Sequence, residues 1–145
     1  MKERFKVITG AFLVLVKNNK IVLLRRRNTG FGDGLYSVPA GHVEFGESLM
    51  GAMMREAKEE VGVTIAAKDL ELVHTMSVNA SDGHRLHCFF KATTWEGELV
   101  NNEPEKCDDL AWFFVDQLPN NIVSYIPQAI ECMQKGEKYS EVGWS

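Results

Sequence analysis

The run 49–61 most constrains the fold, because it has the spacing of a helix and is followed by Gly62, a typical helix stop. At about 100° per residue, its apolar side chains fill one continuous arc, as in a helix packed on a core. Glu56 and Glu60 lie inside that arc, one turn apart, and Glu59 lies at its edge. The apolar members of the arc are Leu49, Met50, Ala52, Met53, Met54, Ala57 and Val61.

Three carboxylates beside a core are electrostatically unfavourable, because they repel one another and lose hydration. Arg55, the one arginine of this helix, can neutralise at most one of them. A hard divalent cation with oxygen ligands resolves the conflict, so Mg²⁺ or Mn²⁺ is the expected cofactor. The alternative is an ordinary solvated helix face, since the edge of an apolar arc is defined only to about one residue.

The net charge of −4 is unevenly distributed along the chain. Residues 1–40 hold eight basic and two acidic side chains, whereas the remainder holds eight basic and eighteen acidic ones. A polymeric nucleic acid usually needs a continuous basic face, which this acidic remainder does not offer. A small anion held through a cation fits the distribution better.

The sequence favours a cytoplasmic protein without a membrane segment. Its longest apolar run, Val7–Val16, is too short to cross a bilayer. Lys17–Lys20 follows that run, where the cleavage site of a signal peptide would need small residues. The three cysteines form no CxxC pair and indicate a reducing compartment.

The remaining pattern predicts one α+β domain over residues 1–145. Strand patterns alternate with turn signals at Asn18-Asn19 and Asp82-Gly83, which predicts hairpins. Residues 28–34 have the composition of a loop, and 122–135 form a closing helix. We therefore expect a sandwich with helices packed on the faces of a sheet. The expected strands are Val7–Val16, Ile21–Arg25, Tyr36–Val38, Leu70–Val78, His84–Thr94 and Leu110–Val115.

The segment 41–63, GHVEFGESLMGAMMREAKEEVGV, resembles the signature of the Nudix hydrolases. The matching positions are Gly41, Glu47, Arg55-Glu56-Ala57, Glu59-Glu60 and Gly62-Val63, with Ala57 standing where a larger aliphatic residue is common. The segments 35–40, 103–107, 112–113 and 118–119 extend the similarity to small MutT-like members that act on nucleoside triphosphates. Together these segments cover most of residues 7–119.

The resemblance implies an α/β/α sandwich with a mixed central sheet, a hairpin, a catalytic loop-helix-loop and a C-terminal helix. It also implies a metal site made by the side chains of Glu56, Glu59 and Glu60 together with the backbone carbonyl of Ala40. Arg55 and Glu47 match the pair that orients the metal-binding carboxylates in the family.

Several carboxylates match positions from which the attacking water could lose its proton. Glu56 is one candidate base, and Glu103 or Glu105 is another, because a loop in this region carries the outer catalytic glutamate of some members. The sequence leaves all three open.

Further side chains are candidates for substrate binding, each with a structural alternative. Arg25 and Arg27, at the end of a strand, could face phosphates or simply be solvated. Phe31, Tyr36 and Trp112 could stack on a base, although most aromatic residues in such a chain belong to the core.

The sequence thus predicts Mg²⁺-dependent hydrolysis of a small nucleotide, in first place a nucleoside triphosphate cleaved to a monophosphate and pyrophosphate. A nucleotide sugar, ADP-ribose or a dinucleotide is the alternative substrate. A non-catalytic nucleotide-sensing domain is the alternative of another class. The resemblance also implies a homodimer.

Overall fold

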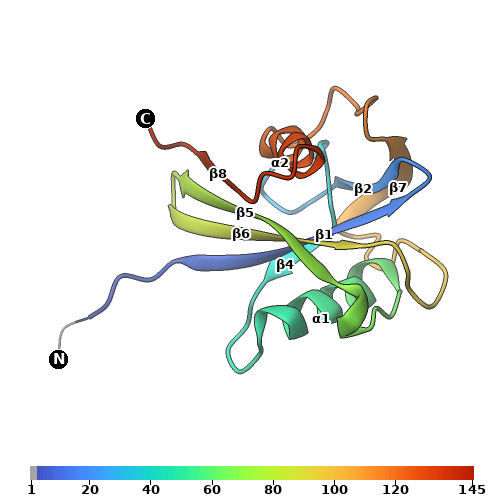
Figure 1. Ribbon diagram of the computed structural model, residues 1–145, viewed down its shortest axis with the longest axis horizontal. Helices are drawn as coiled ribbons and strands as arrows, with labels where there is room; N and C mark the ends of the chain where they lie inside the picture. The colour runs from blue at the N-terminus through green and yellow to red at the C-terminus, as the bar shows by residue number, and fades with distance from the viewer. Residues whose placement is uncertain (1–2) are drawn as a thin grey trace.

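The computed structural model describes residues 3–145, in which eight strands form one mixed sheet (Figure 1). Met1 and Lys2, which the single-domain prediction includes, lie outside the described residues. The main path of the sheet is β3-β2-β1-β6-β5-β8, with β4 paired to β1 and β7 paired to β2. The elements are β1 (Ile8–Lys17), β2 (Lys20–Arg26), β3 (Tyr36–Ser37), β4 (Ala40–His42), α1 (Leu49–Val61), a 3₁₀ turn (Ala67–Asp69), β5 (Glu71–Ala80), β6 (Gly83–Ala92), β7 (Cys107–Phe114), α2 (Tyr125–Gln134) and β8 (Tyr139–Val142).

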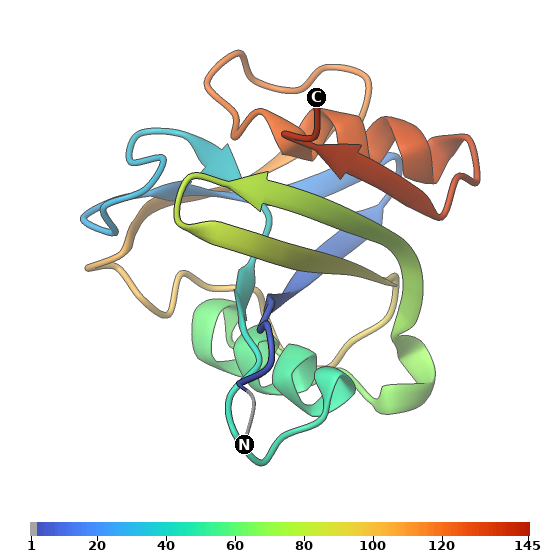
Figure 2. The ribbon, with the colours of Figure 1, turned by 90° about the vertical axis from the view of Figure 1, so that its left-hand side faces the viewer.

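The two helices cover opposite faces of the sheet, as Figures 1 and 2 show. Side chains of β1 alternate between the two faces, so Leu13 and Leu15 pack in the core beneath α1. Phe12 and Val14 pack in a second core beneath α2. The predicted α+β sandwich with a mixed sheet is confirmed.

Local sequence explains where the first hairpin and α1 begin and end. Asn18 and Asn19 both have positive φ, 52° and 61°, as a tight two-residue turn requires. Ser48 caps α1 by accepting the N–H of Gly51 at 2.9 Å. Gly62 ends the helix with φ 74°, and its N–H donates to the carbonyl of Lys58.

The C-terminal part differs from the sequence prediction in two ways. The closing helix begins at Tyr125 instead of residue 122, because the N–H of Val123 donates to the carbonyl of Tyr36 and holds this segment extended beside β3. The strand β8, which we did not predict, pairs in parallel with β5. β1 also pairs in parallel with β6, so the sheet is not built from hairpins alone.

Among residues 3–145, no helix is long and apolar enough to span a membrane.

Candidate active site

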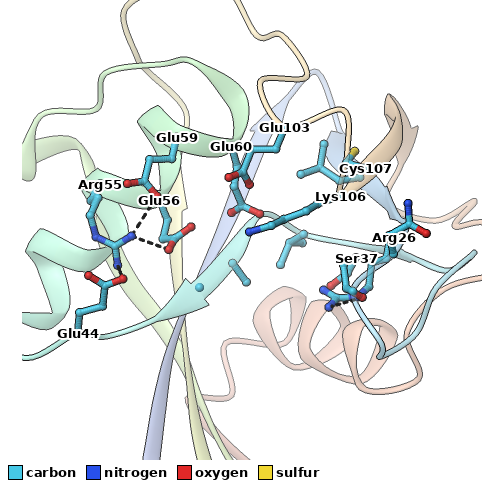
Figure 3. A pocket seen from close by; sticks show the side chains of 16 residues that line it. Arg26, Ser37, Glu44, Arg55, Glu56, Glu59, Glu60, Glu103, Lys106 and Cys107 are labelled. Carbon is cyan, nitrogen blue, oxygen red and sulfur yellow. Dashed lines mark hydrogen bonds and ion pairs between the residues drawn. The ribbon is translucent and has the colours of Figure 1, made fainter.

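An acidic cavity of about 480 Å³ opens on the side of the sheet that α1 covers (Figure 3). Residues of α1, β4, the end of β2 and the segment 103–107 surround this cavity. Its lining residues are Leu24, Arg26, Asn28, Thr29, Ser37, Val38, Ala40, Gly41, Glu44, Arg55, Glu56, Glu59, Glu60, Glu103, Lys106 and Cys107.

Glu56 reaches the cavity because β4 passes close to α1 at a glycine. A Cβ atom added to Gly41 would overlap the Cδ and Oε1 atoms of Glu56, so only glycine leaves room for this carboxylate. The Glu56 side chain is 13% exposed. Burial raises the pKa of Glu56, the Arg55 guanidinium opposes the rise, and the nearby carboxylates of Glu59 and Glu103 add to it.

Glu60 lies one helical turn further and is the most deeply enclosed acid of the site. Its Oε2 atom is buried and has no hydrogen-bond partner. Burial raises the pKa of Glu60 well above its ordinary value, and the charges of Glu56 and Glu103 raise it further. The backbone of Ala40, on β4, opposes this rise. The helix thus presents to the cavity an acid that the protein itself leaves unsatisfied.

Arg55 holds the acids around it in place. Its Nε and Nη2 atoms donate to the two carboxylate oxygens of Glu47 at 3.0 and 2.8 Å, in a bidentate pair. Its Nη1 atom donates to Glu56 at 2.8 Å and to Glu59 at 3.1 Å. The Arg55 guanidinium, helped by the N–H of Glu44, lowers the pKa of Glu47 to about 2. Arg55 therefore connects the loop before α1 to Glu56.

Glu59 differs from the other two acids of the helix. Its side chain is 51% exposed and bonds to Arg55, so it lies at the rim while Glu56 and Glu60 lie within. Within residues 3–145, no three His, Cys, Asp or Glu side chains are gathered tightly enough to form a metal-binding cluster. The predicted set of three carboxylates is therefore only partly assembled.

The donors that are present nevertheless fit a hard cation. The unsatisfied oxygen of Glu60 lies in the cavity that Glu56 and the backbone of Ala40 also line. Oxygen donors of this kind, with no sulfur or imidazole among them, suit a hard divalent ion.

The segment 101–107 brings Glu103 close to Glu60, as Figure 3 shows. The N–H of Asn102 donates to the carbonyl of Glu60, and the N–H of Val100 donates to that of Val61. These bonds attach the segment to the last turn of α1, where carbonyls lack partners within the helix. Glu103 lines the cavity and Glu105 does not, so the structure brings only one of these two candidate bases into it.

The arginines at the end of β2 face different ways. Arg26 lines the cavity, whereas Arg25 and Arg27 are not among its lining residues. The Nε atom of Arg25 donates to Asp108 at 2.7 Å. Sequence reasoning missed Arg26 because strand alternation gives two faces but does not say which one α1 covers.

The three candidate base-stacking aromatics also lie outside the cavity lining. The hydroxyl of Tyr36 donates to Asp109, and the ring is buried. Trp112, 37% exposed, stacks on Trp95. Phe31, 56% exposed, lies against the guanidinium of Arg26, which itself lines the cavity.

Comparisons with known proteins agree with this geometry. The family model described as the NUDIX domain matches residues 6–131. The NAD-capped RNA hydrolase NudC of Stutzerimonas stutzeri is 36% identical over 121 residues, covering 81% of this chain and 40% of that protein. The ADP-ribose pyrophosphatase of Methanocaldococcus jannaschii is 33% identical over 106 residues, covering 73% of this chain and 61% of that protein.

A solved structure is similar over nearly the whole fold. The MutT NUDIX hydrolase of Burkholderia pseudomallei superposes with a TM-score of 0.79 at 25% identity, covering 88% of this chain and 98% of that one. By contrast, the chain spans less than half of the NudC relative and less than two thirds of the ADP-ribose pyrophosphatase.

Proposed function

The chain belongs to the NUDIX domain family, a family of hydrolases that generally use divalent metal ions, and from that premise we propose that it hydrolyses the pyrophosphate bond of a dinucleotide or of ADP-ribose. In such substrates a nucleoside diphosphate is linked to a second group. Water attacks one phosphorus atom of the pyrophosphate and breaks its bond to the bridging oxygen. Two monophosphates result.

The names of the relatives support this substrate class over the nucleoside triphosphate predicted from the sequence. Relatives 33–36% identical are named NAD-capped RNA hydrolase and ADP-ribose pyrophosphatase. The likeness to a MutT enzyme, at 25% identity, supports the fold and the hydrolase chemistry more than the substrate.

The observation that carries the proposal is the buried, unpartnered oxygen of Glu60 next to Glu56. Glu56, Glu60 and the carbonyl of Ala40 would hold a divalent cation, with Mg²⁺ as the expected ion and Glu59 completing the set from the rim. When bound, such a cation neutralises phosphate charge and makes a bound water more acidic. Arg55 keeps Glu56 oriented, through a 2.8 Å bond to its Oε1 atom.

Residues of the cavity outside α1 and β4 supply the remaining roles. Arg26 and Lys106 carry positive charge into the cavity and would bind phosphate oxygens (Figure 3). Glu103 lies close to the two buried acids, whose pKa values its charge helps to raise, and would accept the proton of the attacking water. Of the two candidate bases that line the cavity, Glu56 is paired with Arg55, whereas no salt bridge of the described residues engages Glu103.

The proposal is tested by incubating the purified chain and Mg²⁺ with NAD⁺, ADP-ribose, NAD-capped RNA and a panel of nucleoside triphosphates. Chromatography of the products measures kcat/KM for each compound, and Glu60→Gln is the control for contaminating activity. We expect monophosphate products from NAD⁺ or ADP-ribose with kcat/KM at least about tenfold above any triphosphate, a preference of about 1.4 kcal/mol.

Other outcomes separate the parts of the proposal. Faster cleavage of a triphosphate would overturn the substrate class but keep the hydrolase. Ligand-dependent stabilisation without any product would favour the nucleotide-sensing alternative and overturn the activity.

A further inference from the structure

The side chain of Asn101 bonds to both ends of the short segment that carries Glu103. Its Oδ1 atom accepts the N–H of Glu103 at 3.2 Å, and its Nδ2 atom donates to the carbonyl of Cys107 at 2.7 Å. On the other side, the carbonyl of Glu103 accepts the N–H groups of Lys106 and Cys107 at 2.9 and 3.0 Å. Both polar groups of the Glu103 backbone are therefore held, and a side chain holds one of them.

We call the Asn101 side chain, with its bonds to Glu103 and Cys107, the brace. The next residue, Asn102, is bonded to the helix that carries the buried acids. The N–H of Asn102 donates to the carbonyl of Glu60 at 3.0 Å. Asn101 and Asn102 thus link Glu60, near the end of α1, to Glu103 in the following segment.

We propose that Asn101 is a positioning residue, which directs the carboxylate of Glu103 into the cavity by fixing its backbone N–H. This inference rests on the hydrolysis proposed above. Asn101 is half-buried and lies outside the set of described residues that line the cavity, so it acts through Glu103 and not on the substrate. A reacting group displaced by about 1 Å can slow a reaction a hundredfold, which makes such a brace matter for rate.

The experiment is a double-mutant cycle measured with the best substrate of the wild-type chain. Asn101→Ala should lower kcat about tenfold and change KM by less than about twofold, since it misplaces a base without removing a substrate contact. In the Glu103→Gln background the same change should lower kcat by less than about twofold further, because the brace then has no base to position. A merely structural role would give the same loss in both backgrounds.

Asn102→Ala is the matched control. It removes a neighbouring amide of the same type, whose side chain makes only a 3.4 Å bond to the carbonyl of Lys58. We expect kcat within about twofold of wild type. A loss equal to that of Asn101→Ala would overturn the inference, because it would assign the effect to docking of the whole segment.

The outcomes keep this inference separate from the proposed function. If the wild-type chain cleaves no pyrophosphate compound, the proposed function fails. If it does, and the two losses for Asn101→Ala are equal, only the positioning role fails. Should Asn101→Ala melt below the assay temperature, the cycle is repeated with Asn101→Leu, a side chain of similar size that cannot accept from Glu103, and the two losses are compared in the same way.

Discussion

His87 makes the stability of the protein depend on pH through a single buried imidazole. It lies on β6 with its ring centroid 4.3 Å from that of Phe12 and 4.9 Å from that of Tyr125. Its Nδ1 atom is buried and has no hydrogen-bond partner. Burial, together with the smaller electrostatic effects of Arg85 and His42, lowers the pKa of His87 from 6.5 to about 4.

The sign and size of the effect follow from the two pKa values. Below pH 6.5 the imidazole of His87 is protonated in the unfolded chain, whereas in the folded protein it stays neutral down to about pH 4. The contribution of His87 to the free energy of unfolding is therefore at its maximum above pH 6.5 and decreases as the pH falls from 6.5 towards 4. The loss reaches about 2 kcal/mol at pH 5 and about 3 kcal/mol near pH 4, at 1.36 kcal/mol per pKa unit.

The measurement is urea unfolding of the wild type and of His87→Phe at pH 7.5 and pH 5. Phenylalanine keeps a planar ring among Phe12 and Tyr125 but takes up no proton. Carboxylates such as Glu47 contribute equally to both proteins, so the difference in pH dependence isolates His87. We expect the wild type to lose about 2 kcal/mol more than the variant. Equal losses in the two proteins would refute the reasoning.

Three further predictions concern the acids of the cavity. Glu60→Gln should raise the melting temperature of the metal-free protein in calorimetry, because it removes a buried charge. The same substitution should lower kcat in the product assay by more than about a hundredfold. Gly41→Ala should weaken Mg²⁺ binding at least about tenfold in a calorimetric titration, because the new Cβ displaces Glu56; unchanged affinity would remove Glu56 from the metal site. Glu103→Gln should lower kcat at least about a hundredfold, while Glu105→Gln should stay within about twofold, and the reverse order would transfer the role of base to Glu105.

Features set by neighbouring residues were predictable from the sequence. The periodicity of 49–61 and the turn residues Asn18-Asn19 act within a few positions, and the structure has α1 and the first hairpin where these signals place them. The same periodicity indicated that Glu56 and Glu60 turn inward and that Glu59 lies at the edge, and the structure agrees.

Features set by distant partners were not predictable. β8 is a strand because β5, more than sixty residues earlier, pairs with it, and its own four residues carry too little pattern to reveal this. Likewise, Arg26 reaches the cavity because α1 covers that face of β2, whereas Arg25 turns to Asp108 on β7. Neither contact can be predicted from the residues adjacent in the sequence.

The alternation of β1 has a consequence for how the molecule can change over time. Leu13 and Leu15 support the helix that bears the acids, while Phe12 and Val14 support only α2 on the far side. The sheet therefore lies between the core beneath α2 and the acids of the cavity. Phe12 and Val14 are not among the residues that line that cavity, so substitutions at these two positions can repack the core beneath α2 without touching the acids, whereas Leu13 and Leu15 are tied to the helix that carries them.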